Sequence, residues 1–262
     1  MQVNTPPETK TSEICGFQMV CLSFDEVLER FLDCLKANQG GWVVTLNLEI
    51  LSLCRLDPTY RAMIGSADYV LADGMPFVWA SRLKKGVQHI PERTTGSDLS
   101  GELIRRYDRK KIAIIGGESP PQALKALAIE DHEDVFIFDG IVDMSDEGIQ
   151  ALLAAVKAHG ANLVFVALGV PKQDKVAKAF RAEMPEALIL GVGGTFELIG
   201  GMKIRAPIWM QQSGTEWLWR LYVEPRRLWR RYLLLYWLGL GQLVDDTFLG
   251  FRRLPTRGNS SQ

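Results

Sequence analysis

Six short apolar runs, each ending in glycine or a polar residue, recur through the first 200 positions of this chain. They are WVVTLN (42–47), YVLADG (69–74), KIAIIGG (111–117), DVFIFDG (134–140), NLVFVALG (162–169) and ALILGVGG (187–194). Their apolar residues are continuous rather than alternating, which is typical of strands covered on both faces of a parallel sheet. Each run therefore predicts one buried strand.

Amphipathic segments of helical length separate these runs and would supply the crossovers that parallel strands require. We expect helices over 97–107, 121–129, 145–159 and 171–184. Ser145 suits an N-cap because acidic residues follow it, and Pro171 suits a first helical position. The pattern predicts an α/β fold with a doubly wound, mostly parallel, Rossmann-like sheet, extended by a helical appendage that is basic and aromatic.

Composition divides the chain into four expected parts. They are a disordered leader at 1–14, an α/β domain at 15–204, a helical appendage at 205–250 and a flexible tail at 251–262. The leader is expected to be disordered because it is polar. The longest apolar stretch, YLLLYWLGLG (232–241), is about half of the roughly 20 residues that a bilayer span needs. We therefore expect a chain that is cytosolic or lies on a membrane without crossing it.

Cysteine and histidine are few and scattered. The cysteines lack CxxC or zinc-like spacing, which predicts buried, unpaired thiols at Cys15, Cys21, Cys34 and Cys54. The three histidines (89, 132 and 159) are scattered, which argues against a His-rich metal site and against a Ser/Cys–His triad. No metal site is expected.

The appendage concentrates arginine and tryptophan in a chain whose net charge is only −1. Five of the seven tryptophans lie within 205–237: Trp209, Trp217, Trp219, Trp229 and Trp237. One interpretation is an amphipathic helix packed on the domain, with its arginines solvated. The other is an interfacial membrane helix, with aromatic rings at headgroup level and arginines on anionic lipid. Because these tryptophans exceed what one narrow stripe holds, membrane contact is our expectation.

Ligands of open parallel sheets bind beyond the carboxyl ends of the strands. This rule selects Thr45, Asn47, Asp73, Gly116, Gly117, Asp139, Gly169 and Gly193. Taken alone, Asp73 before Gly74 favours a role in a turn over a role as general base by about two to one. Thr45 and Asn47 could cap a helix or hydrogen-bond a sugar or a base. The glycines could form tight turns or approach a diphosphate, and Arg93 and Gln173 could be solvated or bind phosphate.

Two other classes of function share parts of this pattern. An NAD(P)-binding oxidoreductase uses the same sheet, but the chain lacks G-x-G-x-x-G followed by an acidic residue about 20 positions later. A nucleic-acid-binding module also interleaves arginine with tryptophan. The run YLLLYWLGLGQL favours lipid or protein contact instead, so no nucleic-acid partner is expected.

The ordered set of motifs resembles the WecG/TagA/CpsF glycosyltransferase family (family 26) from about residue 40 to 232. The motifs are TLN, LADG, ER–TGSDL, IIGG, the DG at 139–140, ALGVPKQD, GVGGTFE, RAP and EWLWRL–EPRRLWRRY. Each is weak alone, but the order from RAP through EW to RR is specific. Two positions depart from the family pattern: Asp174 stands where Glu is usual, and Glu197 where Asp is frequent.

The resemblance implies an inverting, metal-independent enzyme with no cofactor, whose donor substrate is a UDP-sugar. It would move a hexose or N-acetylhexosamine to a sugar on a polyprenyl diphosphate, in exopolysaccharide or cell-envelope glycan biosynthesis. It would work as a peripheral protein on the cytoplasmic face of the inner membrane. Independently of the resemblance, an apolar face left by a mobile tail could be covered by a partner subunit in a homo-oligomer.

The family's motifs also assign roles to residues. Its catalytic base falls on Asp73, with Thr45 and Arg93 beside it in the reaction. Substrate binding is expected from Asn47, Gly117, Asp139, Gly169, Gln173 and Gly193. The arginines that the family uses for diphosphate fall on Arg220, Arg227 and Arg230.

Overall fold

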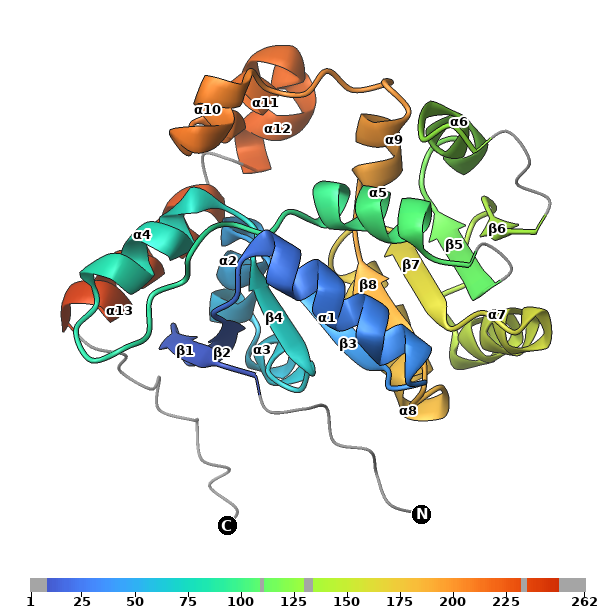
Figure 1. The fold of residues 1–262 in the computed structure, drawn as a ribbon. Helices are drawn as coiled ribbons and strands as arrows, with labels where there is room; N and C mark the ends of the chain where they lie inside the picture. The colour runs from blue at the N-terminus through green and yellow to red at the C-terminus, as the bar shows by residue number, and fades with distance from the viewer. Residues whose placement is uncertain (1–8, 109–110, 130–133, 232–234, 250–262) are drawn as a thin grey trace, which may run out of the picture.

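The computed structural model describes residues 9–108, 111–129, 134–231 and 235–249. Its centre is an eight-stranded sheet in the order β1-β2-β4-β3-β8-β7-β5-β6 (Figure 1). The strands are β1 (Thr11–Ile14), β2 (Phe17–Val20), β3 (Gly41–Leu46), β4 (Tyr69–Ala72), β5 (Ile112–Gly116), β6 (Phe136–Phe138), β7 (Leu163–Ala167) and β8 (Leu188–Gly191). All six predicted strands are confirmed as β3 to β8, and every pair except β1–β2 is parallel.

Helices cover both faces of the sheet, as the doubly wound prediction requires. One face carries α1 (Phe24–Lys36), α5 (Gly96–Arg106), α6 (Pro120–Ala126) and α9 (Thr195–Ile199). The other carries α2 (Leu48–Leu56), α3 (Pro58–Ile64), α4 (Met75–Leu83), α7 (Asp146–His159) and α8 (Lys172–Glu183). Two separate apolar cores result, one on each side of the sheet.

The four predicted helices correspond to α5, α6, α7 and α8. Ser145 caps α7 as expected, because its Oγ accepts a hydrogen bond from the Gly148 N–H at 3.1 Å. Pro171 lies one position earlier than predicted, at the N-cap of α8. The four cysteines are buried and unpaired, as their spacing predicted.

The expectation of a disordered leader is wrong over Thr11–Ile14, which form β1 and pair antiparallel with β2. The turn between them places Cys15 and Gly16 at positive φ (52° and 76°). Side chains alternate along β1, so only Ser12 and Ile14 face inwards. A short strand with one buried face looks polar on average, which explains why composition missed it.

The appendage consists of two parts with different surroundings. Helices α10 (Ile208–Gln212), α11 (Glu216–Val223) and α12 (Pro225–Arg231) lie together at the top of the molecule in Figure 1. Helix α13 (Trp237–Leu249) instead returns to the core and packs against α2 and α4. Within the described residues, no helix is both long enough and apolar enough to span a bilayer.

A buried carboxylate holds α13 to the core. Asp246, 2% exposed, accepts the Cys15 N–H at 2.8 Å and the Lys84 ammonium group at 2.8 Å. The backbone of Gly239 lies directly on α2, where a Cβ would come within 2.4 Å of the Leu48 carbonyl oxygen. The expected extent of the appendage, 205–250, therefore needs correction at its end, because Trp237–Leu249 pack against the core.

Two glycines of α13 provide a matched test of this packing. Gly239→Ala should destabilise the fold by about 1–3 kcal/mol, because its methyl group would overlap the backbone of α2. Gly241→Ala should be neutral or stabilising by up to about 1 kcal/mol, since nothing lies within 4 Å and alanine favours helix. Thermal denaturation of both variants measures the difference. Equal midpoints would mean that α13 does not dock as described.

Candidate active site

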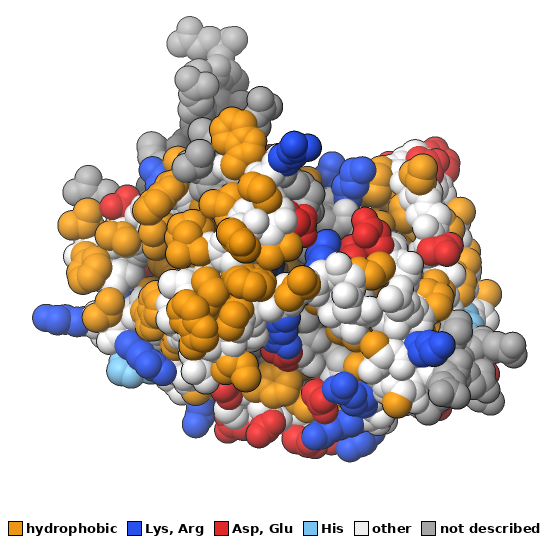
Figure 2. Space-filling model, turned by 90° about the horizontal axis from the view of Figure 1, so that it is seen from above, with side chains coloured by type: hydrophobic (Ala, Val, Ile, Leu, Met, Phe, Trp, Pro, Cys, Tyr) orange, Lys and Arg blue, Asp and Glu red, His pale blue; other side chains and the backbone are white. Residues whose placement is uncertain are grey.

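A cavity of about 430 Å³ lies where the carboxyl ends of β3, β4, β7 and β8 meet, below α11. Figure 2 views the molecule from this side, with hydrophobic side chains gathered on one part of the face and charged side chains around the rest. Eight predicted residues line the cavity: Thr45, Asn47, Asp73, Arg93, Gly169, Gln173, Gly193 and Arg220. The sheet rule thus brings most of the predicted residues to one place.

Gly116 and four residues with an expected role are not among those that line it. Gly117 lies against Phe196 and Ala167. Asp139 is exposed after the edge strand β6, on the far side of the sheet from β4. The side chains of Arg227 and Arg230 lie outside the described residues. The roles expected of these four residues stay predictions.

Asp73 follows β4 directly, and its N–H donates to the Leu46 carbonyl oxygen at 2.9 Å, which fixes the strand end. Burial raises the pKa of its carboxyl group to about 6. The Arg220 guanidinium group opposes this rise, the Glu216 carboxylate adds to it, and Arg93 opposes it again. A carboxylate with this pKa is ionised at neutral pH yet basic enough to accept a proton.

Thr45 and Asn47 both serve the fold as well as lining the cavity. The Asn47 Oδ1 accepts the N–H groups of Glu49 at 3.1 Å and Ile50 at 3.0 Å, so it caps α2. The buried Thr45 hydroxyl donates to the Gly191 carbonyl oxygen at 3.4 Å, across the β3–β8 pair. The capping interpretation of Asn47 is confirmed, while its amide NH₂ stays available for a ligand.

Gln173 supports the turn after β8 rather than reaching into open space. Its Oε1 accepts the Gly193 N–H at 2.9 Å, and Gly193 adopts a φ of +52°. A Cβ at Gly191 would lie 2.9 Å from the Gln173 Nε2. Glycine at 191 and 193 therefore permits the close approach of this side chain to the turn.

Asp174 does not line the cavity but lies beneath it. The Tyr60 hydroxyl donates to its Oδ2 at 2.6 Å, joining α3 to the start of α8. Burial raises the pKa of the Asp174 carboxyl group to about 6, although the hydrogen bond from Tyr60 lowers it. This departure from the family pattern therefore concerns the support of the site.

Glu197 and Lys203 form a second charged pair at the cavity. The Lys203 Nζ lies 3.8 Å from the Glu197 Oε1, while the buried Oε2 has no hydrogen-bond partner among the described residues. Glu197 lines the cavity, but this second oxygen is buried and does not face the open space. The sequence showed Glu197 as a departure from the family pattern but gave no sign of Lys203.

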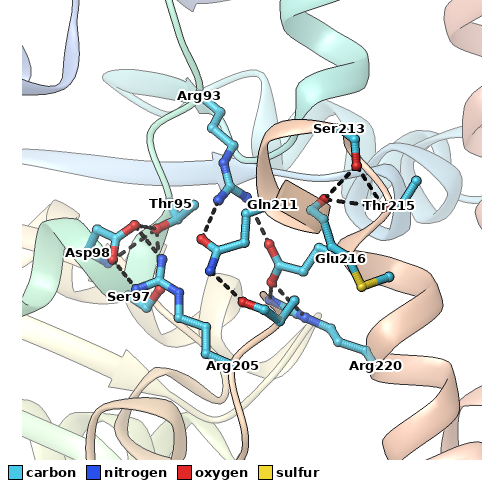
Figure 3. A network of polar contacts seen from close by, with 12 residues as sticks. Arg93, Thr95, Ser97, Asp98, Arg205, Gln211, Ser213, Thr215, Glu216 and Arg220 are labelled. Atoms are coloured by element: carbon cyan, nitrogen blue, oxygen red, sulfur yellow. Dashed lines mark hydrogen bonds and ion pairs between the residues drawn. The ribbon is translucent and has the colours of Figure 1, made fainter. Parts of the chain in front are cut away.

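A polar network closes the cavity from above (Figure 3). Arg93 donates to the Glu216 Oε2 at 2.8 Å and to the Gln211 Oε1 at 2.9 Å. Arg220 donates through its Nε to the Glu216 Oε1 at 3.0 Å. Among these residues, sequence reasoning missed Glu216 and Gln211, since the contacts join segments more than 100 positions apart.

A bidentate pair anchors the loop that leads into the appendage. Arg205 donates to both carboxylate oxygens of Asp98, at 2.5 Å and 2.6 Å, and the Thr95 hydroxyl also donates to Asp98 at 2.8 Å. Burial would raise the pKa of Asp98, but the hydrogen bonds from Arg205 and Thr95 lower it overall. We call the segment 205–231, with helices α10, α11 and α12, the roof of the cavity. The arginine of the RAP motif thus fixes the start of the roof on α5.

No group of three or more His, Cys, Asp or Glu side chains in the described parts of the chain could hold a metal ion. The cavity instead carries arginine and lysine side chains near Asp73 and Glu197. Positive charge from side chains can stabilise a leaving anion.

Asp73→Asn should stabilise the protein by up to about 2 kcal/mol at pH 7.5, because the half-buried wild-type carboxylate is charged there. The folded-state pKa is raised to about 6 from 3.8, so the gain should shrink as the pH falls between these values. Thermal denaturation at pH 7.5 and pH 4 measures it, with the exposed Asp139→Asn as the control. A gain independent of pH, or a loss of stability, would contradict the account of Asp73.

Residues 12–249 match the family described as "Glycosyl transferase WecG/TagA/CpsF family". The match extends beyond the motifs to include the β1–β2 hairpin and α13, so it covers the core, the roof and the returning helix. This family of glycosyltransferases takes part in cell-envelope glycan synthesis. The cavity therefore lies in a transferase, and the chain belongs to the WecG/TagA/CpsF glycosyltransferase family.

Proposed function

We propose that this chain transfers a hexose or N-acetylhexosamine from a UDP-sugar to a sugar on a polyprenyl diphosphate, with inversion and without a metal ion. The observation that carries the proposal is the position of Asp73 in a cavity that Arg93 and Arg220 also line. An inverting transfer needs one base for the acceptor hydroxyl and positive charge for the leaving diphosphate.

In the proposed reaction Asp73 accepts the proton of the acceptor hydroxyl group. The hydroxyl oxygen attacks the anomeric carbon, and the bond from that carbon to the UDP oxygen breaks on the opposite face. The electron pair of the broken bond leaves with UDP, whose charge Arg220 and Arg93 stabilise. Thr45, next to the same strand end, orients the reacting sugar. One glycosidic bond forms, and inversion follows from attack on the face opposite UDP.

The donor fits the side of the cavity built from β7, β8 and α9. Glycine at 169 and 193 lets the backbone approach a ligand there, at φ of +71° and +52°. The side chains of Glu197 and Lys203 also line the cavity, where they supply an acceptor and a donor for hydroxyl groups of the sugar. We assign this side to the donor sugar and place the donor diphosphate beside Arg93 and Arg220.

The lipid-linked acceptor would be reached from a membrane surface. Large apolar side chains on the roof are exposed, among them Ile208 (72%), Trp209 (64%) and Tyr222 (80%). Arg226 of α12 is also exposed. Aromatic and basic side chains together suit the headgroup region of an anionic bilayer. We therefore propose that the roof rests on the cytoplasmic face of the membrane.

A radiolabelled transfer assay tests the reaction directly. Wild-type protein with a panel of UDP-sugars, and with polyprenyl-diphosphate-linked N-acetylglucosamine or glucose, should form a lipid-extractable disaccharide from one donor. Asp73→Asn should lower the rate about 100- to 10,000-fold, the contribution of a general base. The wild-type rate should fall as the pH drops through about 6, since Asp73 must be ionised.

Transfer at the wild-type rate by Asp73→Asn would remove Asp73 from the role of base. If no donor transfers although UDP binds, the proposed substrates are wrong. Folding of the variant is checked by its thermal midpoint, for which the substitution predicts an increase at pH 7.5.

Membrane docking is tested on the roof. The double variant Trp209→Glu and Tyr222→Glu should bind vesicles of anionic phospholipid at least about tenfold more weakly, because two exposed apolar anchors become charged. Ile141→Glu is the matched control, since Ile141 is 99% exposed but lies in the loop after β6. Cosedimentation measures all three proteins. Equal losses in both variants, or none in the roof variant, would contradict docking through the roof.

A further inference from the structure

One carboxylate joins the core to the roof above the cavity. Glu216 is the first residue of α11, and one of its carboxylate oxygens accepts a hydrogen bond from Arg93, which precedes α5 in the core. The other oxygen accepts a hydrogen bond from Arg220, one turn further along α11. Figure 3 shows both guanidinium groups directed at this single side chain. The two cations assigned to the leaving diphosphate are therefore held by the same residue.

The pair with Arg93 is shielded from solvent. The side chains of Arg93 and Glu216 are 16% and 18% exposed, and the Arg93 Nη1 lies 2.8 Å from the Glu216 Oε2. Arg93 makes its other described hydrogen bond to Gln211, which also belongs to the roof. Charged hydrogen bonds with this burial are stronger than those at an open surface. Arg93 is thus oriented by the roof, although it comes from the core.

The turn before α11 sets where Glu216 points. Gly214 adopts a φ of +65°, and its backbone lies on α4, where a Cβ would come within 2.6 Å of the Trp79 ring. The pair between Arg205 and Asp98 fixes the other end of this segment. The start of α11 is therefore placed by contacts on both sides of the cavity, and Glu216 faces inwards between them.

Asp73 lies within the electrostatic influence of this arrangement. The charged groups that act on it are Arg220 and Glu216 of α11, Arg93 of the loop before α5, and Asp98 of α5. Two guanidinium groups on one side of a cavity repel each other unless an anion lies between them. The Glu216 carboxylate is that anion in this structure.

We propose that Glu216 is a positioning residue for the transfer proposed above. Its carboxylate docks the roof on the core and holds Arg93 and Arg220 on the side of the cavity where the diphosphate leaves. The active site is then complete only when α11 is docked. The inference rests on the proposed function for its kinetic consequences, but not for the docking itself.

Docking is tested without any activity, by limited trypsin digestion of Glu216→Gln under native conditions. The amide presents an NH₂ donor to one guanidinium group, so it cannot accept from both arginines. Cleavage within 205–231 should become at least about tenfold faster. Glu183→Gln is the matched control, because Glu183 forms an exposed pair with Lys157 at 3.3 Å away from the cavity. The control should digest like the wild type.

Kinetics test the positioning role. Glu216→Gln should lower kcat about 10- to 100-fold, while Glu216→Asp, which keeps the charge, should recover part of the rate. The acid limb of the pH–rate profile should move to lower pH in Glu216→Gln, since the charge of Glu216 raises the pKa of Asp73. A residue that only stabilised the fold would leave this limb in place.

The outcomes are distinct. Wild-type digestion of Glu216→Gln, or a kcat within twofold of the wild type with an unmoved acid limb, overturns the inference. If the wild-type protein transfers no sugar, the proposed function fails, and the digestion comparison still decides whether Glu216 docks the roof. Thermal midpoints show whether each variant is folded before either test.

Discussion

The shared direction of β3, β4, β7 and β8 determines where this protein can act. Leu46 pairs with Ala72, and Val44 and Val166 both pair with Gly191, so these strands end at one edge of the sheet. Each parallel strand must leave that edge through a loop, because its continuation lies on a face of the sheet. The loops cannot fill the space above the strand ends, and the cavity is what remains. Asp73 reaches it only because it is the first residue after β4.

The roof depends on anchors at both of its ends. Arg205 forms an ion pair with Asp98 after α9, where the roof begins. The buried Asp246 forms an ion pair with Lys84 where the chain returns as α13. A buried carboxylate without its partners is strongly destabilising, so α13 gains little freedom to leave the core. The short helices between these anchors make few buried contacts of their own. Their position over the cavity is therefore imposed by the two ends and by Glu216.

Local sequence pattern was sufficient for six of the eight strands and for the residues that follow them, but it missed β1 and β2. Continuous apolar runs placed β3 to β8, and the residues that end them include Asp73 and Gly193. The same reasoning could not find the contact of Arg93 with Glu216, since the two lie 123 positions apart and meet only through the path of the roof. It also placed α13 in the separate appendage, whereas α13 packs against α2 and α4. An apolar helix has the same composition whether it is buried by lipid or by α2 and α4, so composition alone cannot separate these cases.

The roof acts on Asp73 in two opposing ways. By covering the strand ends it removes water, and burial raises the pKa of the carboxyl group. By bringing Arg220 close it lowers the same pKa, and Glu216 partly cancels that effect. A roof that only buried Asp73 would raise the pKa of its carboxyl group further. A roof that brought two arginines without Glu216 would make the carboxylate a weaker base. The pKa of about 6 results from the combination, so we infer that the strength of the base and the docking of α11 are coupled through Glu216.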